Sequence, residues 1–210
     1  DTMYPYMQAR TIPGSYMPTT DYLAAPNVNQ VTVSELQTMQ ANGWTIVPHQ
    51  TIGTALTGMS ESQMRAEIEE VLAVHRSYGF TYATMFYPAG GAGNALSDTV
   101  MASYGIRYGN NDNTAGVQAC RPLYGGMINP YKLWSYTADG KTFAQISTAV
   151  DHAIKYGGYL GLLWHDGDGA DETPFKDAVA YLYRLREANV IDVVNYETFF
   201  NRFVNPRKAR

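Results

Sequence analysis

The sequence is poor in cysteine and in charge: its 210 residues include one cysteine, Cys120, and 16% charged residues. A single cysteine excludes a disulfide bond within the chain and a metal site built from several thiolates. No apolar run approaches the roughly 20 residues that a membrane-spanning helix needs. A net charge of −4 gives no strong positive field, so we expect neither a membrane span nor a nucleic-acid partner.

Signatures of several common functional classes are also missing. The chain has no Gly-x-Ser-x-Gly motif, which removes the main sequence signal of a serine hydrolase. The glycine-rich segment 89–94 has neither the Lys-Ser/Thr pair of a phosphate-binding loop nor the spacing of a dinucleotide-binding loop. We interpret this segment as a tight turn. The acidic segment 166–172 lacks the spacing of an EF-hand loop and is interpreted as a solvated turn.

What the chain does contain is typical of a globular protein with helices and strands. Hydrophobic residues make up 45% of the sequence, with 19 glycines and 10 prolines, and no linker or repeat divides it. We therefore expect a single domain over residues 1–210. Tyrosine is unusually frequent, at 17 residues. Tyrosine rings suit carbohydrate surfaces and interfaces, because their faces are apolar and their tips are polar.

Strand-like and helix-like segments alternate along the chain. Two capping boxes, Thr32 with Glu35 and Ser60 with Gln63, predict helices that end near Gly43 and Gly79. Further helices are expected at residues 95–104, 143–155 and 175–188, with a short helix at the C-terminus. Strands are expected at residues 11–17, 44–47, 80–87, near 106 and 117, and at 159–164 and 190–194. This alternation predicts a mostly parallel sheet covered by helices, and the number of units favours a barrel.

The four histidines fall into two kinds. His75 has helical spacing from the apolar residues before it, and His152 lies in the middle of a predicted helix, so we interpret both as structural or surface residues. His49 and His165 each follow an apolar strand. Because chemistry in parallel barrels sits at the C-terminal ends of strands, these two are candidates for metal binding or proton transfer.

Several segments, in this order, resemble one known family. They are Tyr4-Pro5-Tyr6-Met7 with Ile12-Pro13-Gly14-Ser15-Tyr16, Gly43-Trp44-Thr45-Ile46 with His49, Arg65-Ala66-Glu67-Ile68, Phe86-Tyr87-Pro88-Ala89-Gly90, and Gly161-Leu162-Leu163-Trp164-His165. Together they are similar to the polysaccharide deacetylases, the carbohydrate esterases of the NodB-homology type. The similarity runs over most of the chain.

The resemblance implies an α/β fold, a distorted (β/α) barrel of the NodB-homology type. It implies a hydrolase that removes N- or O-acetyl groups from a polysaccharide or oligosaccharide with a divalent metal, often zinc. It also implies work outside the cell or at the cell envelope. On this basis His49 resembles a metal ligand and His165 the catalytic acid. Substrate-binding positions implied in the same way are Tyr87, Pro88, Gly90 and Trp164.

The sequence departs from the family pattern at several motifs. The Asp-Asp motif would precede Tyr4, on a first strand that this sequence does not contain. Gly53 stands where the second histidine ligand belongs, Phe86 stands where an arginine belongs, and no clear Asp-Trp motif is found. A barrel without its first strand would borrow one from a larger parent chain, or cover the open edge by forming a homo-oligomer.

Two functional hypotheses follow from these matches and departures. The first is a metal-assisted deacetylase. The second is a deacetylase-like barrel that has lost catalysis and serves as a carbohydrate-binding or structural module.

Overall fold

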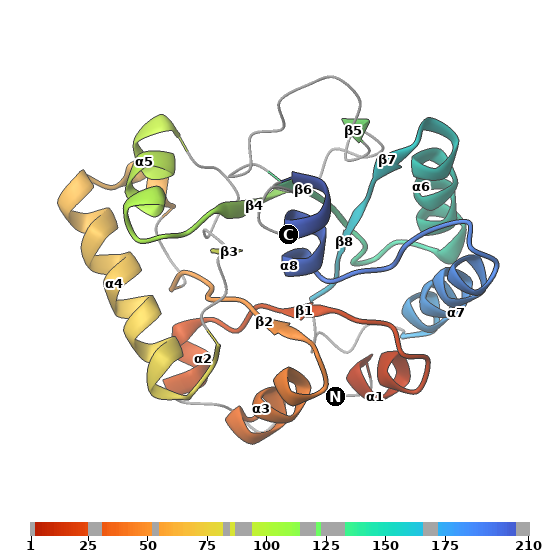
Figure 1. The fold of residues 1–210 in the computed structure, drawn as a ribbon, viewed down its shortest axis with the longest axis horizontal. Coiled ribbons are helices and arrows are strands. Elements are labelled where there is room, and N and C mark those ends of the chain that lie inside the picture. The colour runs from red at the N-terminus through yellow and green to blue at the C-terminus, as the bar shows by residue number, and fades with distance from the viewer. Residues whose placement is uncertain are drawn as a thin grey trace. The chain divides into compact units, whose positions relative to one another are not determined.

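Strands and helices alternate in the computed structural model, which describes residues 3–24, 31–51, 55–81, 85–86, 94–113, 121–122, 133–165 and 172–204 (Figure 1). Contacts between residues divide the chain into two compact units. The first unit comprises residues 1–13, 113–127 and 134–194, and the second comprises residues 14–112, 128–133 and 195–210.

The second unit holds most of the N-terminal half of the chain. Its elements are β1 (Ser15–Tyr16), α2 (Thr20–Ala24), α3 (Val33–Ala41), β2 (Thr45–Ile46), the 3₁₀ turn η1 (Leu56–Gly58), α4 (Glu61–Ser77), β3 (Met85–Phe86), α5 (Ala95–Ser103), β4 (Tyr108–Asn113, which ends one residue beyond the unit boundary), α8 (Tyr196–Phe199) and the π-helical turn η4 (Phe200–Val204). Strands β1 and β2 pair in parallel, and so do β3 and β4. The β1–β2 register resumes further along in the parallel bridge between Thr19 and His49.

The first unit combines the start of the chain with a segment from its C-terminal half. Its elements are α1 (Met3–Gln8), β5 (Arg121–Pro122), β6 (Leu133–Thr137, which begins one residue before the unit boundary), α6 (Phe143–Tyr156), β7 (Gly158–Tyr159), β8 (Gly161–Leu163) and α7 (Thr173–Glu187). Strands β6 and β8 pair in parallel, whereas β5 and β7 pair antiparallel. Helix α6 packs against α7, and α1 also packs against α7.

Local sequence signals set the helix boundaries as predicted. The capping boxes at Thr32 and Ser60 are both formed, and they open α3 and α4. Capping boxes also open α5 at Asn94 and α6 at Thr142. Helix α6 ends at Gly157, whose φ of 62° is one that glycine adopts without strain.

Several parts of the sequence prediction differ from the structure, and strand β6 was not predicted at all. Residues 190–194 form no strand, because α7 ends in a left-handed turn at Asn189 and the segment continues without a strand partner in the described chain. Helices α1 and α2 were not predicted, since each is at most six residues long and offers too little apolar periodicity to recognise. The predicted strand near Val117 lies outside the described residues.

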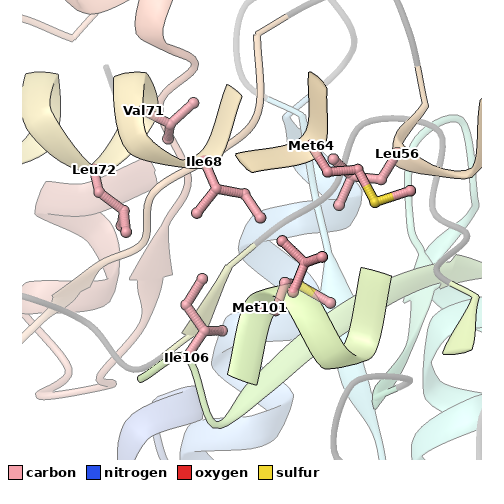
Figure 2. Close-up of a cluster of buried hydrophobic side chains, with 8 residues drawn as sticks. Leu56, Met64, Ile68, Val71, Leu72, Met101 and Ile106 are labelled. Carbon is pink, nitrogen blue, oxygen red and sulfur yellow. The ribbon is translucent and has the colours of Figure 1, made fainter. Parts of the chain in front are cut away.

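Apolar residues of α4 and α5, with one residue of η1 and one that follows α5, form a tightly buried cluster in the second unit (Figure 2). Its members are Leu56, Met64, Ile68, Val71, Leu72, Val100, Met101 and Ile106. In α4 the spacing of four, three and one residues between Met64, Ile68, Val71 and Leu72 places these side chains on one helical face. Burial of this face against α5 fixes the position of α4, which also carries a contact to the loop after β2, described below.

His75 is a core residue, as its helical spacing predicted. It lies one turn beyond the apolar stripe of α4, is 1% exposed, and its ring packs against Phe80 with 5.0 Å between ring centroids. Burial lowers the pKa of His75 from 6.5 to about 4. The imidazole is therefore neutral in the folded protein at neutral pH.

Truncation of the core should destabilise the protein far more than truncation of the surface of the same helix. We expect Met101→Ala to lower the free energy of unfolding by about 2–5 kcal/mol, because it leaves a cavity in a fully buried site. Leu96, also in α5, is 40% exposed, and Leu96→Ala should change stability by no more than about 0.5 kcal/mol. Urea unfolding of both variants measures the difference, and equal effects would contradict the packing described.

The buried His75 should make stability fall in mild acid. The unfolded chain binds a proton at His75 near pH 6.5, whereas the folded chain does so only near pH 4. The stability that comes from burying a neutral His75 is therefore present above about pH 6.5, and it declines as the pH falls. Between about pH 7 and about pH 5 we expect a loss of about 2 kcal/mol. Urea unfolding at both pH values should show that His75→Leu removes this part of the pH dependence; an unchanged dependence would contradict it.

Candidate functional site

The structure describes three of the predicted site residues in detail. Trp164 and His165 follow β8 in the first unit, and His49 follows β2 in the second. The predicted substrate-binding positions Tyr87, Pro88 and Gly90 lie outside the described residues. So does Gly53, which stands at a motif position. Because His49 and His165 belong to different units, the surroundings of each are described separately.

His165 forms a pair with Asp139, a residue that the sequence analysis did not select. Strands β6 and β8 are neighbours with Thr137 opposite Leu163, and the Ala138 N–H donates to the Leu163 carbonyl at 2.9 Å. Asp139 lies two residues beyond the end of β6, and His165 lies two residues beyond the end of β8. Parallel pairing therefore brings both residues to the same edge of the sheet.

Both oxygens of the Asp139 carboxylate contact His165. Oδ1 accepts from the backbone N–H of His165 at 2.9 Å, and Oδ2 lies 2.5 Å from the ring Nδ1. An ionised carboxylate only accepts hydrogen bonds, so Nδ1 carries the proton in this contact. The side chain of His165 is 60% exposed. This arrangement holds the imidazole in one tautomer and leaves Nε2 as the nitrogen that takes up or releases a proton.

Trp164 anchors the backbone next to His165. Its ring packs edge-on against Phe175 of α7, with centroids 5.0 Å apart and an interplanar angle of 84°. The same ring also contacts the buried clusters around Ile146 and Ile12. These contacts give Trp164 a packing role, while its predicted role in substrate binding stays a prediction.

His49 lies at the end of the second strand pair. Its Nδ1 is 2.6 Å from the backbone carbonyl of Gln50. Because a carbonyl accepts hydrogen bonds, Nδ1 is the donor there, and Nε2 then carries the lone pair. A neutral imidazole with its lone pair on Nε2 is the form that binds metals or accepts a proton.

The loop after His49 is tied to α4 by a carboxylate. Glu67 accepts from the backbone N–H of Thr51 at 3.0 Å and also from the Thr51 hydroxyl. Since α4 is fixed by the core cluster, these contacts position the backbone two residues beyond His49. No short-range sequence signal identifies this pairing, because Thr51 and Glu67 are 16 residues apart.

The described residues do not fit a complete metal centre. They contain no group of three or more His, Cys, Asp or Glu side chains placed to hold one ion. A catalytic zinc site usually needs three protein ligands. Of the predicted ligand positions only His49 is described, so the structure described here supplies one imidazole and no closed coordination set.

The helices of the described segments also include none long and apolar enough to cross a membrane.

Comparison with known proteins shows a shared fold at low sequence identity. No protein-family model matches the sequence, and no curated protein sequence matches it either. Among solved structures, the family 4 acetyl xylan esterase from Clostridium thermocellum, in complex with a cobalt ion, is 16% identical with a TM-score of 0.65. That match covers 99% of this chain and 88% of the esterase.

Two further solved structures share this fold. The family 4 carbohydrate esterase from Streptomyces lividans, in complex with acetate, is 14% identical over 90% of this chain and 81% of its own, with a TM-score of 0.61. A mutant of a family 4 pseudoenzyme is 6% identical over 96% of this chain and 60% of its own, with a TM-score of 0.63. These matches confirm the predicted α/β fold of the NodB-homology type; closure of the strands into a barrel stays a prediction.

The Asp139–His165 contact should control the tautomer of the ring. In Asp139→Asn an amide N–H₂ can donate to Nδ1, so we expect the proton of the neutral imidazole to move to Nε2. Nitrogen-15 NMR of the His165 ring in the wild type and the variant measures this change. The His49 ring is the internal control, because its Nδ1 partner is a backbone carbonyl that the substitution leaves in place. An unchanged His165 spectrum would show that Asp139 does not set the tautomer.

Proposed function

We propose that this protein is a carbohydrate deacetylase-like hydrolase in which His165 transfers a proton during cleavage of an acetyl ester or amide. The observation that carries the proposal is the Asp139–His165 pair at the C-terminal edge of two parallel strands. Support comes from the fold shared with family 4 carbohydrate esterases. Acetylated polysaccharides or oligosaccharides are the substrate class that this support favours.

The geometry of the pair suits a general acid. When water adds to an acetyl carbon, the water gives up a proton and the bond between that carbon and the sugar oxygen or nitrogen breaks. The leaving oxygen or nitrogen then needs a proton. His165 Nε2 supplies that proton, while Nδ1–H remains hydrogen-bonded to Asp139. The carboxylate orients the ring and stabilises its protonated form before the transfer. The exposure of His165 allows a large glycan to approach this nitrogen.

The two carboxylate oxygens restrict different motions of His165. The contact from Oδ2 to Nδ1 limits rotation of the ring, and the contact from Oδ1 to the backbone N–H limits movement of the loop that carries it. A proton donor held in this way keeps its reacting nitrogen in place, which is what positioning contributes to catalysis.

We further propose His49 as a candidate ligand for a divalent metal, as the family resemblance implies. A metal bound there would polarise the acetyl carbonyl and activate water. It would need ligands beyond those that the described residues provide. The zinc identity predicted from the resemblance is part of this proposal.

A second candidate function is a binding module that has lost catalysis. Two observations favour it: a family 4 pseudoenzyme shares the fold, and the described residues form no closed metal site. Such a module would bind an acetylated glycan without releasing acetate. Assays of acetate release and of glycan binding on the same preparation therefore separate the two functions.

Turnover should depend on both members of the pair. With acetylated xylan as an ester substrate and an N-acetylglucosamine oligomer as an amide substrate, we expect His165→Ala to lower kcat by about 10²-fold or more. Asp139→Asn should lower kcat by about 10²–10⁴-fold, because the ring is then held in the wrong tautomer. Acetate release, measured with and without added zinc or cobalt, is the readout.

His152→Gln is the matched control for these variants. His152 lies in α6 of the same unit and takes no part in the Asp139–His165 pair, so this variant should keep wild-type turnover. If the wild type releases acetate and all three variants retain its rate, the assigned roles are wrong. If the wild type binds glycan but releases no acetate, the binding module replaces the hydrolase.

A further inference from the structure

Two adjacent threonine hydroxyls, at Thr19 and Thr20, are buried and have no hydrogen-bond partner in the part of the chain that the structure describes. Thr19 is 7% exposed and Thr20 is 6% exposed, and neither Oγ1 atom has a hydrogen-bond partner among the described residues. A buried hydroxyl that makes no hydrogen bond destabilises the folded protein, and most such groups in native proteins are satisfied by protein, water or ligand. These hydroxyls therefore need an explanation.

The strand register places Thr19 beside His49. Ser15 pairs with Thr45 and Tyr16 with Ile46, and the same offset recurs at the parallel bridge between Thr19 and His49. Directly paired residues on adjacent parallel strands project to the same side, with neighbouring strands about 5 Å apart. The Thr19 hydroxyl and the His49 imidazole thus lie on one side of the strand pair, beyond the C-terminal ends of both strands.

Thr20 is equally buried but differs in position. It is the first residue of α2 and lies outside the β1–β2 register. The two adjacent threonines therefore share burial and an unpartnered hydroxyl, while only Thr19 is paired with His49. This difference makes Thr20 a matched reference for Thr19.

We propose that Thr19 is a substrate-binding residue whose hydroxyl donates a hydrogen bond to the acyl oxygen of an acetyl group, or of the acetate product, bound beside His49. This inference rests on the proposed function, which supplies the acetyl group. The hydroxyl can donate one hydrogen bond in a desolvated position, and an acceptor oxygen of a bound group would satisfy it. The acyl oxygen of an acetyl group is such an acceptor.

A valine at this position separates binding from packing. Valine has nearly the shape of threonine and lacks only the hydroxyl. If the hydroxyl makes no protein contact, Thr19→Val should leave stability unchanged or raise it, because a desolvated polar group is removed. If the hydroxyl served the structure, the same change would lower stability. Loss of binding without loss of stability is the signature of a ligand-binding group.

The test is a titration of the full chain with sodium acetate at constant pH. Chemical shifts of the His49 ring and of the Thr19 and Thr20 methyl groups report binding, and urea unfolding reports stability. The wild type should show saturable shifts. Thr19→Val should bind acetate about tenfold or more weakly, as expected for the loss of one hydrogen bond to a charged oxygen, with stability equal to or above the wild type.

Two control variants define the outcomes. Thr20→Val tests burial alone, and Thr38→Val removes an exposed hydroxyl of α3 that bonds to the Ser34 carbonyl; both should bind acetate as the wild type does. The inference is overturned if Thr19→Val binds like the wild type, if Thr20→Val loses binding to the same extent, or if the wild type shows no saturable shift, as when only water occupies the position.

The same variants distinguish failure of this inference from failure of the proposed function. Acetate binding that depends on Thr19 in a chain that releases no acetate from glycans would retain the inference and reject the hydrolase. Normal acetate release with an unchanged kcat/KM in Thr19→Val would retain the hydrolase and reject the role of Thr19.

Discussion

The pairing of parallel strands is the constraint on which the candidate chemistry of this protein depends. Parallel strands end at the same edge, so residues just beyond paired positions meet there even when they are far apart in sequence. The β6–β8 register brings Asp139 to His165 across 26 residues. The β1–β2 register brings Thr19 to His49 across 30 residues by the same rule. In both cases backbone pairing, not side-chain packing, selects the polar residues that can act together.

The dependence on register explains which parts of the site could be predicted from the sequence. Helix starts such as Thr32 and Ser60 depend on contacts within three residues, so local patterns predict them correctly. His165 was also found locally, because it follows an apolar strand. Asp139 was missed because its role depends on the pairing of β6 with β8, and α6 and β7 lie between them in the chain. Strand β6 was not among the predicted strands either, so a search beyond the predicted strand ends would not have reached Asp139.

The wrong prediction of a strand at residues 190–194 shows that a local sequence pattern is not enough to form a strand. The segment is rich in β-branched residues, which favour a strand, but a strand also needs a partner with unpaired backbone groups. Asn189 turns the chain with a φ of 55°, and Val190 is exposed. Composition alone could not reveal that the partner is missing from the described sheet edges.

Histidine illustrates how environment, rather than residue type, sets function in this chain. His75 is enclosed by the α4 core and is held neutral by burial, so it affects stability and cannot exchange protons freely at neutral pH. His165 has the reverse setting, with its backbone and Nδ1 fixed by one carboxylate and its ring exposed. A buried ring without a charged partner is suited to packing, whereas an oriented, accessible ring is suited to proton transfer. Sequence spacing separated these two classes because helical and strand-end positions impose different exposures.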